Sequence, residues 1–320
     1  MSNQTQTTSE FVGLSSRDAF GKVIVELGEK YENIVALSAD LAGSVKLNDF
    51  IKKFPDRFVN FGVAEQNMMG SAAGLTLAGK VPFACTYAAF ASMRACEQIR
   101  TDIAYNGLPV KIISSHGGIT FGIAGATHQA LEDIGILRGM PGMAVFSPAD
   151  GVETAAILRV VMDIDGPVYV RLSRVKEKQV YTQDFDYQIG KPSLLVEGKD
   201  LLLIATGAEV GETLEAAQVL KEKGLDAGVL NISTIKPLDQ AATARVIKDY
   251  PAAMTVEQHN ILNGLGSLVS EVIAENDLPV KFRRHGLMDH FTTSGPYSEL
   301  LSYYQLDGNG IADTVLKFID

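Results

Sequence analysis

The chain of 320 residues is long enough for two domains, and its 46% hydrophobic and 21% charged residues are typical of a globular protein. The net charge of −10 argues against nucleic acid or an anionic membrane surface as a partner. No apolar run reaches the ~18–20 residues that a membrane-spanning helix needs, and the polar start is not a signal peptide. We expect residues 1–10 to be a disordered tail and the protein to be cytoplasmic, with Cys85 and Cys96 as unpaired core residues.

Residues 11–176 alternate between apolar, strand-like runs and helical stretches. These runs are apolar throughout rather than at every second position, which indicates strands that are buried on both faces. The pattern therefore predicts an α/β domain with a doubly wound, mainly parallel sheet. Strands are expected at 33–40, 58–63, 81–87, 110–115, 143–147 and 167–172, and helices at 18–30, 66–78, 88–105, 127–138 and 150–163.

A change in composition separates this domain from a second one. Charge, Tyr, Gly and Pro replace the apolar runs over 177–197, which predicts an interdomain linker. The alternation returns over 198–320 and predicts a smaller α/β domain. Its strands are expected at 200–205, 227–232, 253–256 and 280–284, and its helices at 206–224, 239–249, 265–276, 297–305 and 310–319.

Glu65 lies at the junction between the strand 58–63 and the helix 66–78, where open α/β sheets tend to place ligands. One interpretation is an acid in the first helical turn, favoured by the helix dipole. The other is a buried carboxylate that gives a proton to a cofactor. Glu65 alone favours the first interpretation, so the segments that accompany it decide between the two.

Further polar and aromatic residues follow the carboxyl ends of the other predicted strands, and these ends converge on one edge of such a sheet. Tyr87 and Phe90 follow one strand and suit either core packing or a clamp on a ligand ring. His116 and His128 bracket a loop with four glycines, which lets the backbone approach a ligand closely. Because imidazoles titrate near neutral pH, we favour a functional role for this pair.

Arg17 and Arg174 lie near expected element ends, where a guanidinium suits bidentate phosphate binding, although the commoner fate of arginine is a solvated surface. No motif predicts a metal site. His285 and His290 lack a third ligand at metal spacing, and the chain has no HExxH, P-loop or paired CxxC.

Read together, these segments resemble the C-terminal half of the transketolase family of thiamine-diphosphate enzymes. The resemblance covers nearly the whole chain after the tail, and several motifs in order are far more specific than any one alone. The strongest are Ser38-Ala-Asp-Leu41, Asn60-Phe-Gly-Val-Ala-Glu-Gln-Asn67, Thr127-His-Gln-Ala-Leu-Glu-Asp133, Leu137-Arg-Gly-Met-Pro-Gly142, Ser147-Pro-Ala-Asp150 and Glu257-Gln-His-Asn260.

The resemblance implies that 11–176 is the pyrimidine-binding domain and 198–320 the transketolase C-terminal domain. Glu65 would hydrogen-bond the aminopyrimidine ring of thiamine diphosphate and so help to generate the ylid, the nucleophile of the cofactor. Tyr87 and Phe90 would line that ring, with Asp40 close to the cofactor. The sugar phosphate would be held by Arg17, Ser44, His116 and Arg174, with His128 at the reacting end of the donor, so that Glu65, His116 and His128 are the expected catalytic residues.

Two positions depart from the family pattern. Ala124 stands where transketolases carry an aspartate that reads a sugar hydroxyl. We expect its loss to relax or redirect hydroxyl recognition, which favours an unusual or modified ketose. Ala64 stands where many transketolases have arginine. An alanine at this position resembles deoxyxylulose-phosphate synthases and some split enzymes.

The Gly-Asp-Gly segment that holds the diphosphate and Mg²⁺ in full-length family members does not occur in this sequence. The resemblance therefore implies a separate diphosphate-binding partner subunit, with cofactor and Mg²⁺ held largely by that partner and an α₂β₂ assembly by analogy.

The expected activity is the transfer of a two-carbon ketol unit from a ketose phosphate to an aldose phosphate. The nearest rival enzyme is a deoxyxylulose-phosphate synthase-like protein or the β subunit of a 2-oxoacid dehydrogenase. A test of ketose phosphates against pyruvate as donor would separate a transketolase from this rival. A non-catalytic regulatory paralogue is the rival of a different class. Ala124 favours that rival, and the presence of Glu65 speaks against it.

Overall fold

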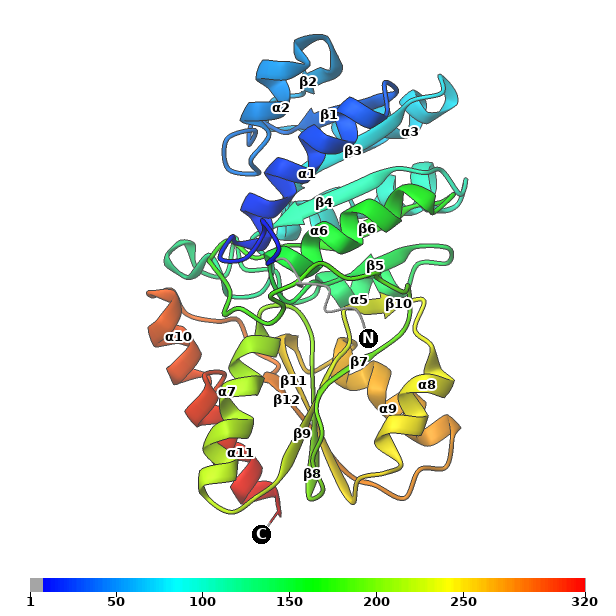
Figure 1. The fold of residues 1–320 in the computed structure, drawn as a ribbon. Coiled ribbons are helices and arrows are strands. Elements are labelled where there is room, and N and C mark those ends of the chain that lie inside the picture. Colours follow the sequence, from blue (N-terminus) through cyan, green and yellow to red (C-terminus); the bar gives the residue numbers. More distant parts are fainter. Residues whose placement is uncertain (1–7, 320) are drawn as a thin grey trace.

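Two sheets, one in each half of the chain, organise the computed structural model, which describes residues 8–319 (Figure 1). The first sheet has the strand order β10-β5-β6-β4-β3-β1-β2, and all its pairs are parallel except β10 with β5. This confirms the predicted mainly parallel α/β fold. The strands from the first half are β1 (Ile34–Ser38), β2 (Phe58–Asn60), β3 (Val81–Tyr87), β4 (Lys111–Ser115), β5 (Ala144–Phe146) and β6 (Val168–Arg171).

Helices cover both faces of this sheet, because alternate strand residues point to opposite sides. Ile34 and Ala36 of β1 pack in the cluster that contains α1 (Ser16–Lys30) and α6 (Gly151–Val160). Val35 and Leu37 pack on the other side, against α3 (Glu65–Leu77) and the helical stretch after β3. The remaining helical segments of this half are α2 (Asn48–Lys53), η1 (Pro55–Arg57), η2 (Phe90–Arg94), α4 (Cys96–Gln98), η3 (Ile99–Ala104), η4 (Gly122–Ala124), α5 (Asp133–Arg138) and η5 (Val161–Asp163).

The second sheet has the order β12-β11-β8-β9-β7, with β7 antiparallel to β9 and the other pairs parallel. Its strands are β7 (Ser193–Val196), β8 (Leu201–Ala205), β9 (Ala227–Asn231), β11 (Ala252–Asn260) and β12 (Lys281–Leu287). Its helices are α7 (Glu209–Glu222), α8 (Gln240–Ile247), α9 (Leu265–Glu275), α10 (Tyr297–Tyr303) and α11 (Gly308–Ile319).

Strand β10 (Thr234–Lys236) joins the two halves, because it follows β9 in the chain and yet pairs with β5 of the first sheet. The Nζ of Lys236 also donates to the carbonyl oxygens of Arg138 and Met140, at 2.9 and 2.6 Å. Strands β7 and β10 and helix α2 were not predicted. Each is short, and β7 lies within the segment interpreted as a linker.

One predicted helix is wrong over its first half. Helix 127–138 begins only at Asp133, because the backbone of Ala130 is engaged elsewhere. Its carbonyl accepts from the N–H of Gly118 at 3.0 Å, and its N–H donates back to the Gly118 carbonyl at 3.2 Å. The helix expected at 88–105 is present but contains the π-helical segments η2 and η3.

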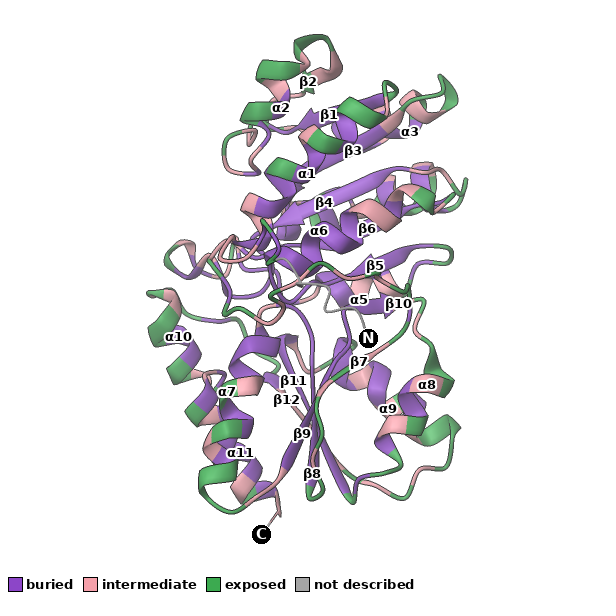
Figure 2. Cartoon of the chain, in the orientation of Figure 1, coloured by how far each residue is buried: buried purple, intermediate pink, exposed green. Residues whose placement is uncertain are grey.

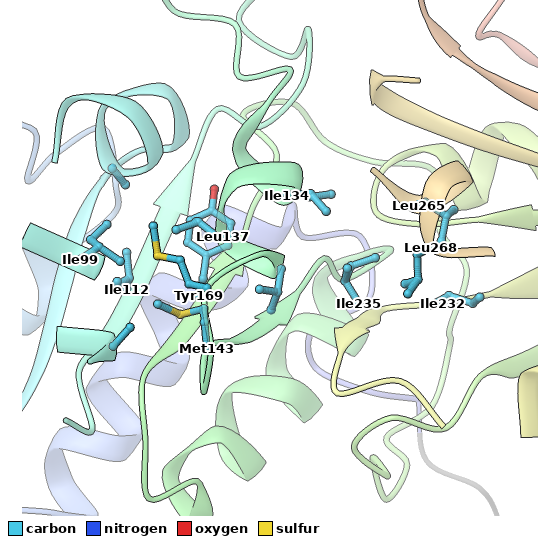
Figure 3. Packing of buried hydrophobic residues seen from close by; sticks show 14 of the residues in the cluster. Ile99, Ile112, Ile134, Leu137, Met143, Tyr169, Ile232, Ile235, Leu265 and Leu268 are labelled. Carbon is cyan, nitrogen blue, oxygen red and sulfur yellow. The ribbon is translucent and has the colours of Figure 1, made fainter. Parts of the chain in front are cut away.

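The apolar core runs without interruption from one half of the chain into the other. Figure 2 shows the buried residues concentrated in the strands of both sheets. Figure 3 shows Ile112 and Tyr169 of the first sheet in the same cluster as Ile235 and Leu265 of the second half. The two halves are therefore fixed to each other by burial as well as by β10.

Among the described residues, no helix is both long and apolar enough to cross a membrane. Residues 1–7 of the predicted tail lie outside the described part of the chain. Within the rest of that tail, Ser9 is buried and its hydroxyl donates to Asp184 at 2.7 Å. Cys85 and Cys96 are both unpaired, and burial raises the pKa of the Cys85 thiol.

Candidate active site

An aromatic cluster lies where the carboxyl ends of β3 and β4 meet. Tyr87 ends β3 and His116 follows β4, and their ring centroids are 3.8 Å apart. Phe90 lies 5.7 Å from Tyr87 and 5.2 Å from His128. Phe121, from the glycine-rich loop, lies 4.8 Å from His116. The structure thus brings together the four rings that the sequence singled out.

Glu65 is the first residue of α3, and its side chain is only 1% exposed. Its Oε2 accepts a hydrogen bond from Nη1 of Arg94 at 2.7 Å. The guanidinium of Arg94 lies in turn over the ring of Phe90, 4.2 Å from the centroid. The carboxylate is therefore buried rather than solvated, and one arginine links it to the aromatic cluster.

His116 is held in an unusual conformation at the end of β4. Its φ of 66° lies in the left-handed region, which a residue with a Cβ adopts only when its surroundings require it. Its Nδ1 lies 2.7 Å from the hydroxyl oxygen of Ser115. Burial lowers the pKa of His116 to about 3, and the nearby charges of Arg17 and Arg174 act in the same direction. The expectation that both imidazoles titrate near neutral pH is therefore wrong for His116, which is neutral at physiological pH.

His128 occupies the other end of the loop and is half-buried. Its Nδ1 lies 2.9 Å from the hydroxyl of Thr127, and its ring makes edge contacts with Phe90 and Phe121. The loop turns at Gly125, whose φ of 73° favours glycine. His116 thus forms the buried floor of the cluster and His128 its more accessible side.

Two guanidinium groups lie beside this cluster. Nη1 of Arg17 donates to the carbonyl of Ser44 at 2.9 Å, and its Nε is buried without a hydrogen-bond partner. Arg174 stacks on Phe121, 4.6 Å from the ring centroid. Burial lowers the pKa of Arg17, and the charge of Arg174 lowers it further. In residues 8–319 neither arginine forms an ion pair, so both charges are available to an anion.

Asp40 lies at the end of β1, exposed and with a left-handed φ of 60°. Two hydrogen bonds join it to the side chain of Asn60. The Asp40 N–H donates to Oδ1 of Asn60 at 2.9 Å, and Nδ2 of Asn60 donates to the Asp40 carboxylate at 3.3 Å. Within the described part of the chain, no hydrogen bond or ion pair joins Asp40 to the aromatic cluster. Asp40 therefore lies at the same sheet edge but outside the cluster.

Comparison with known families accounts for both halves of this arrangement. The family model described as "Transketolase, pyrimidine binding domain" matches residues 12–178, and the one described as "Transketolase, C-terminal domain" matches residues 190–311. The chain belongs to the transketolase family.

Several similar proteins of this family have about the same length as the chain. A Methanocaldococcus jannaschii protein named as a transketolase C-terminal section is 47% identical, over 94% of this chain and 95% of its own. One of the subunits of an apulose-4-phosphate transketolase, from Phocaeicola vulgatus, is 39% identical, over 96% and 98%. The solved structure described as a split gene transketolase, inactive beta4 tetramer, superposes with a TM-score of 0.86 at 40% identity, over 96% of this chain and 98% of that chain.

The side chains of the cluster fit the pyrimidine half of thiamine diphosphate, the cofactor that the family implies. Tyr87 and Phe90 offer aromatic surface for a flat ring, and Glu65, linked to Phe90 through Arg94, offers a buried carboxylate for a ring nitrogen. Among residues 8–319, no group of three or more His, Cys, Asp or Glu side chains is placed to hold a metal ion.

The transketolase C-terminal domain braces the glycine-rich loop. The N–H of Gly295 donates to the Gly122 carbonyl at 3.1 Å, and the Ile119 N–H donates to the side chain of Gln258 at 3.3 Å. A Cβ added to Gly122 would overlap the carbonyl oxygen of Gly295, so this contact requires glycine. The second domain therefore shapes the loop between His116 and His128.

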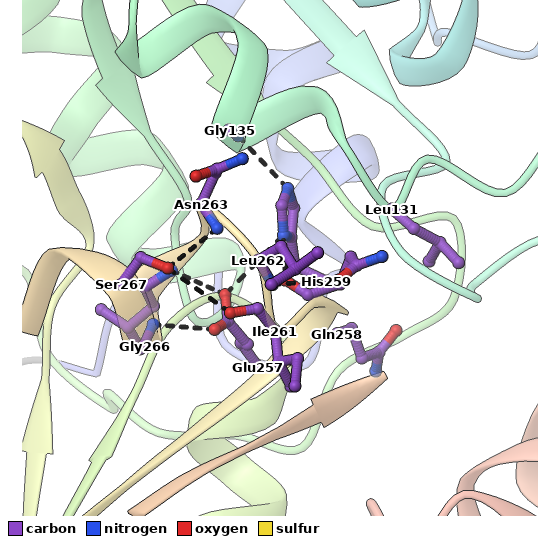
Figure 4. A network of polar contacts seen from close by, with 12 residues as sticks. Leu131, Gly135, Glu257, Gln258, His259, Ile261, Leu262, Asn263, Gly266 and Ser267 are labelled. Atoms are coloured by element: carbon purple, nitrogen blue, oxygen red, sulfur yellow. Dashed lines mark hydrogen bonds and ion pairs between the residues drawn. The ribbon is translucent and has the colours of Figure 1, made fainter. Parts of the chain in front are cut away.

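The segment Glu257–Asn260, which carries part of the family resemblance, is structural in this chain (Figure 4). The Glu257 carboxylate accepts from the N–H groups of Leu265 and Gly266 at the start of α9, at 2.6 and 2.8 Å. His259 accepts from the N–H of Gly135 in the first domain at 3.2 Å. Burial raises the pKa of Glu257 to about 7 and lowers that of His259 to about 4.

Two residues of the cluster were not predicted from the sequence. Phe121 was overlooked among the glycines of its loop, although an aromatic side chain between two candidate histidines was a usable signal. Arg94 gave no signal, because its proximity to Glu65 arises from the packing of η2 against α3. Only the folded structure shows that the charges of Arg94 and Glu65 are paired.

Proposed function

We propose that this chain is the second subunit of a heteromeric transketolase that uses thiamine diphosphate. It would transfer a two-carbon ketol unit from a ketose phosphate to an aldose phosphate. The observation that supports this function most is the buried carboxylate of Glu65 beside the Tyr87–Phe90–His116–His128 cluster, in a chain of the transketolase family.

The chain supplies the pyrimidine end of the reaction. Thiamine diphosphate, once bound, would supply a carbon nucleophile for the ketose carbonyl. The carboxyl group of Glu65 would exchange a proton with the ring nitrogen of the pyrimidine, while Tyr87 and Phe90 line the ring and exclude water. Asp40 would lie near the cofactor at the same edge of the sheet.

The sugar phosphate would lie across the arginine side of the cluster. Arg17 and Arg174, which form no ion pair with the residues that the structure describes, provide two guanidinium groups for the phosphate, with Ser44 beside Arg17. His116, held neutral by burial, can accept or donate one hydrogen bond to a hydroxyl group. His128, at the accessible side, would contact the reacting end of the donor.

A partner subunit would hold the diphosphate and most of the contacts to Mg²⁺, and an α₂β₂ heterotetramer in the cytoplasm is the assembly that we propose. Relatives of about the same length support a separate partner, since one is named as a C-terminal section and another as a single subunit of a transketolase. The domain limits that we propose are 11–176 for the pyrimidine-binding domain, 177–197 for the linker and 198–320 for the C-terminal domain.

The substrate is proposed to be a ketose with an altered hydroxyl pattern. The loop between His116 and His128 offers no acidic acceptor, because Ala124 stands in place of the family aspartate and the loop contains no other Asp or Glu. The similar subunit from Phocaeicola vulgatus is named for a transketolase of apulose 4-phosphate, which is consistent with this proposal.

The test is reconstitution with the partner subunit, thiamine diphosphate and Mg²⁺, followed by a screen of ketose phosphates and of pyruvate as donors. We expect ketol transfer, reduced at least ~100-fold by Glu65→Gln because the pyrimidine loses its proton-exchanging group. Glu97→Gln, which changes an acid on α4, should leave turnover unchanged. Use of pyruvate instead of a ketose phosphate, or full turnover by Glu65→Gln, would contradict the proposal.

A further inference from the structure

We propose that Arg94 is a stand-in for the pyrimidine ring. In the free chain it takes the two contacts that the ring would use, and it turns outward when the cofactor binds. This inference rests on the function proposed above, and it assigns to Arg94 control over the affinity of the site for its cofactor.

The contacts of Arg94 carry the proposal. Its Nη1 donates to Oε2 of Glu65 at 2.7 Å, and its guanidinium carbon lies 4.2 Å from the centroid of the Phe90 ring. A pyrimidine ring bound here would need a hydrogen bond to the same carboxylate and contact with the same aromatic face. One planar cation thus occupies both positions at once.

Access to Glu65 requires a movement, because its side chain is 1% exposed. Helix α3 cannot supply that movement readily, since Met68 and Met69 in its first turns are fully buried in the core. Arg94 can supply it, because its side chain is 44% exposed and leads directly to solvent. It is also the last residue of the π-helical segment η2, a type of segment that is frequent at functional sites.

The electrostatics explain why a stand-in is present. A buried carboxylate without a counter-charge destabilises the fold, and Arg94 neutralises Glu65 until another partner arrives. An ion pair whose cation is nearly half exposed is weak, because water competes for the cation. The pair is therefore strong enough to stabilise the buried carboxylate in the free chain, and weak enough for the cofactor to displace Arg94.

Cofactor affinity in the reconstituted two-subunit complex gives the main test. We expect Arg94→Ala to bind thiamine diphosphate about two- to fivefold more tightly than the wild type, which is the range expected for removal of one partly exposed pair. Arg94→Lys keeps the charge but loses the planar contact with Phe90, so its affinity should fall between the two. Arg100→Ala, an exposed arginine on η3, is the matched control and should leave the affinity unchanged.

The isolated full chain gives a readout that needs no turnover. Arg94→Ala should lower its midpoint of thermal unfolding, and the same substitution should have little effect in a Glu65→Gln background, where no buried charge is left unpaired. If Arg94→Ala does not fold, Arg94→Lys carries the affinity test.

Unchanged or weaker cofactor binding by Arg94→Ala and Arg94→Lys would overturn the inference, since Arg94 would then support the bound ring rather than compete with it. Equal destabilisation by Arg94→Ala in both backgrounds would also overturn it. Failure of the proposed function looks different, because the wild-type complex itself would then bind no thiamine diphosphate.

Discussion

Two arginine–carboxylate pairs of almost equal length differ in their burial and in the number of hydrogen bonds that hold the arginine. Arg94 and Glu65 are joined at 2.7 Å, and Arg171 and Asp133 at 2.8 Å. The Arg171 side chain is 7% exposed and donates further bonds to the carbonyls of Ala130 and Gln258, while Arg94 is 44% exposed with one bond to Glu65. Distance alone does not tell a structural clamp from an exchangeable contact; burial and the number of bonds do.

The location of each pair explains the difference. Arg171 lies between the two domains, and Asp133 also accepts from the hydroxyl of Tyr169 at 2.7 Å, so any movement would break several bonds together. Arg94 lies at the rim of the cluster, where a ligand can replace its bonds. The chain therefore places its rigid charges at the domain seam and its replaceable charges at the candidate active site.

Arg171→Met should give the largest effect. The substitution leaves Asp133 buried without its counter-charge, and we expect a loss of about 3–5 kcal/mol in the free energy of unfolding. Urea unfolding of the isolated chain measures it, with Arg138→Met, whose partner Glu271 is 46% exposed, as the control. If Arg171→Met lost less free energy of unfolding than Arg138→Met, the buried pair would not be stronger than the partly exposed one.

The buried acid Glu209 tests the effect of burial on a charged group through the pH dependence of stability. Burial raises the pKa of Glu209 to about 8, against about 4.3 in the unfolded chain. The contribution of protonated Glu209 to the free energy of unfolding is fully present below about pH 4.3, and it is lost as the pH rises through about 8. Glu209→Gln, which keeps an acceptor for Gln258, should therefore gain stability over the wild type between about pH 5 and pH 9, by an amount on the order of a few kcal/mol.

Thermal unfolding of the wild type and Glu209→Gln over that pH range is the measurement. A constant difference between the two proteins at every pH would show that the pKa of Glu209 is the same in the folded and unfolded chain, which contradicts a raised pKa.

Gly122→Ala tests the brace between the second domain and the candidate site. The added Cβ overlaps the carbonyl of Gly295, and we expect a loss of about 1–3 kcal/mol together with a raised KM for the donor, as the loop shifts. Gly74→Ala is the control, because it lies inside α3 with no atom within 4 Å of the added Cβ. Equal kinetics for Gly122→Ala and the wild type would show that the brace does not position the loop.

The smallest expected effect concerns His116. Burial lowers the pKa of His116 to about 3, so its imidazole should stay neutral between about pH 5 and pH 8. An NMR titration of the ring protons, assigned with His116→Gln, should show no shift over that range. A midpoint within it would mean that the ring is more hydrated than the structure shows.

Much of the fold followed from the sequence, because buried parallel strands leave long apolar runs such as 81–87, which is β3 to the residue. The edge strands β7 and β10 were missed, since three or four residues on a sheet edge carry little periodicity. The first half of helix 127–138 was wrong because pairing of Ala130 with Gly118 overrides local helix propensity.

For the candidate site, the sequence indicated its location through the residues that follow strand ends. It could not show the partner of Glu65 or the neutral state of His116. Both depend on distances and burial between segments far apart in the chain, and no local pattern encodes them.

The most direct test of the central claim is a crystal structure of the reconstituted complex with thiamine diphosphate and Mg²⁺. We predict that the carboxylate of Glu65 hydrogen-bonds a nitrogen of the pyrimidine ring across a subunit interface, with Arg94 turned away from it. A Glu65 side chain directed away from the ring, or a cofactor held wholly by one polypeptide, would contradict this mechanism.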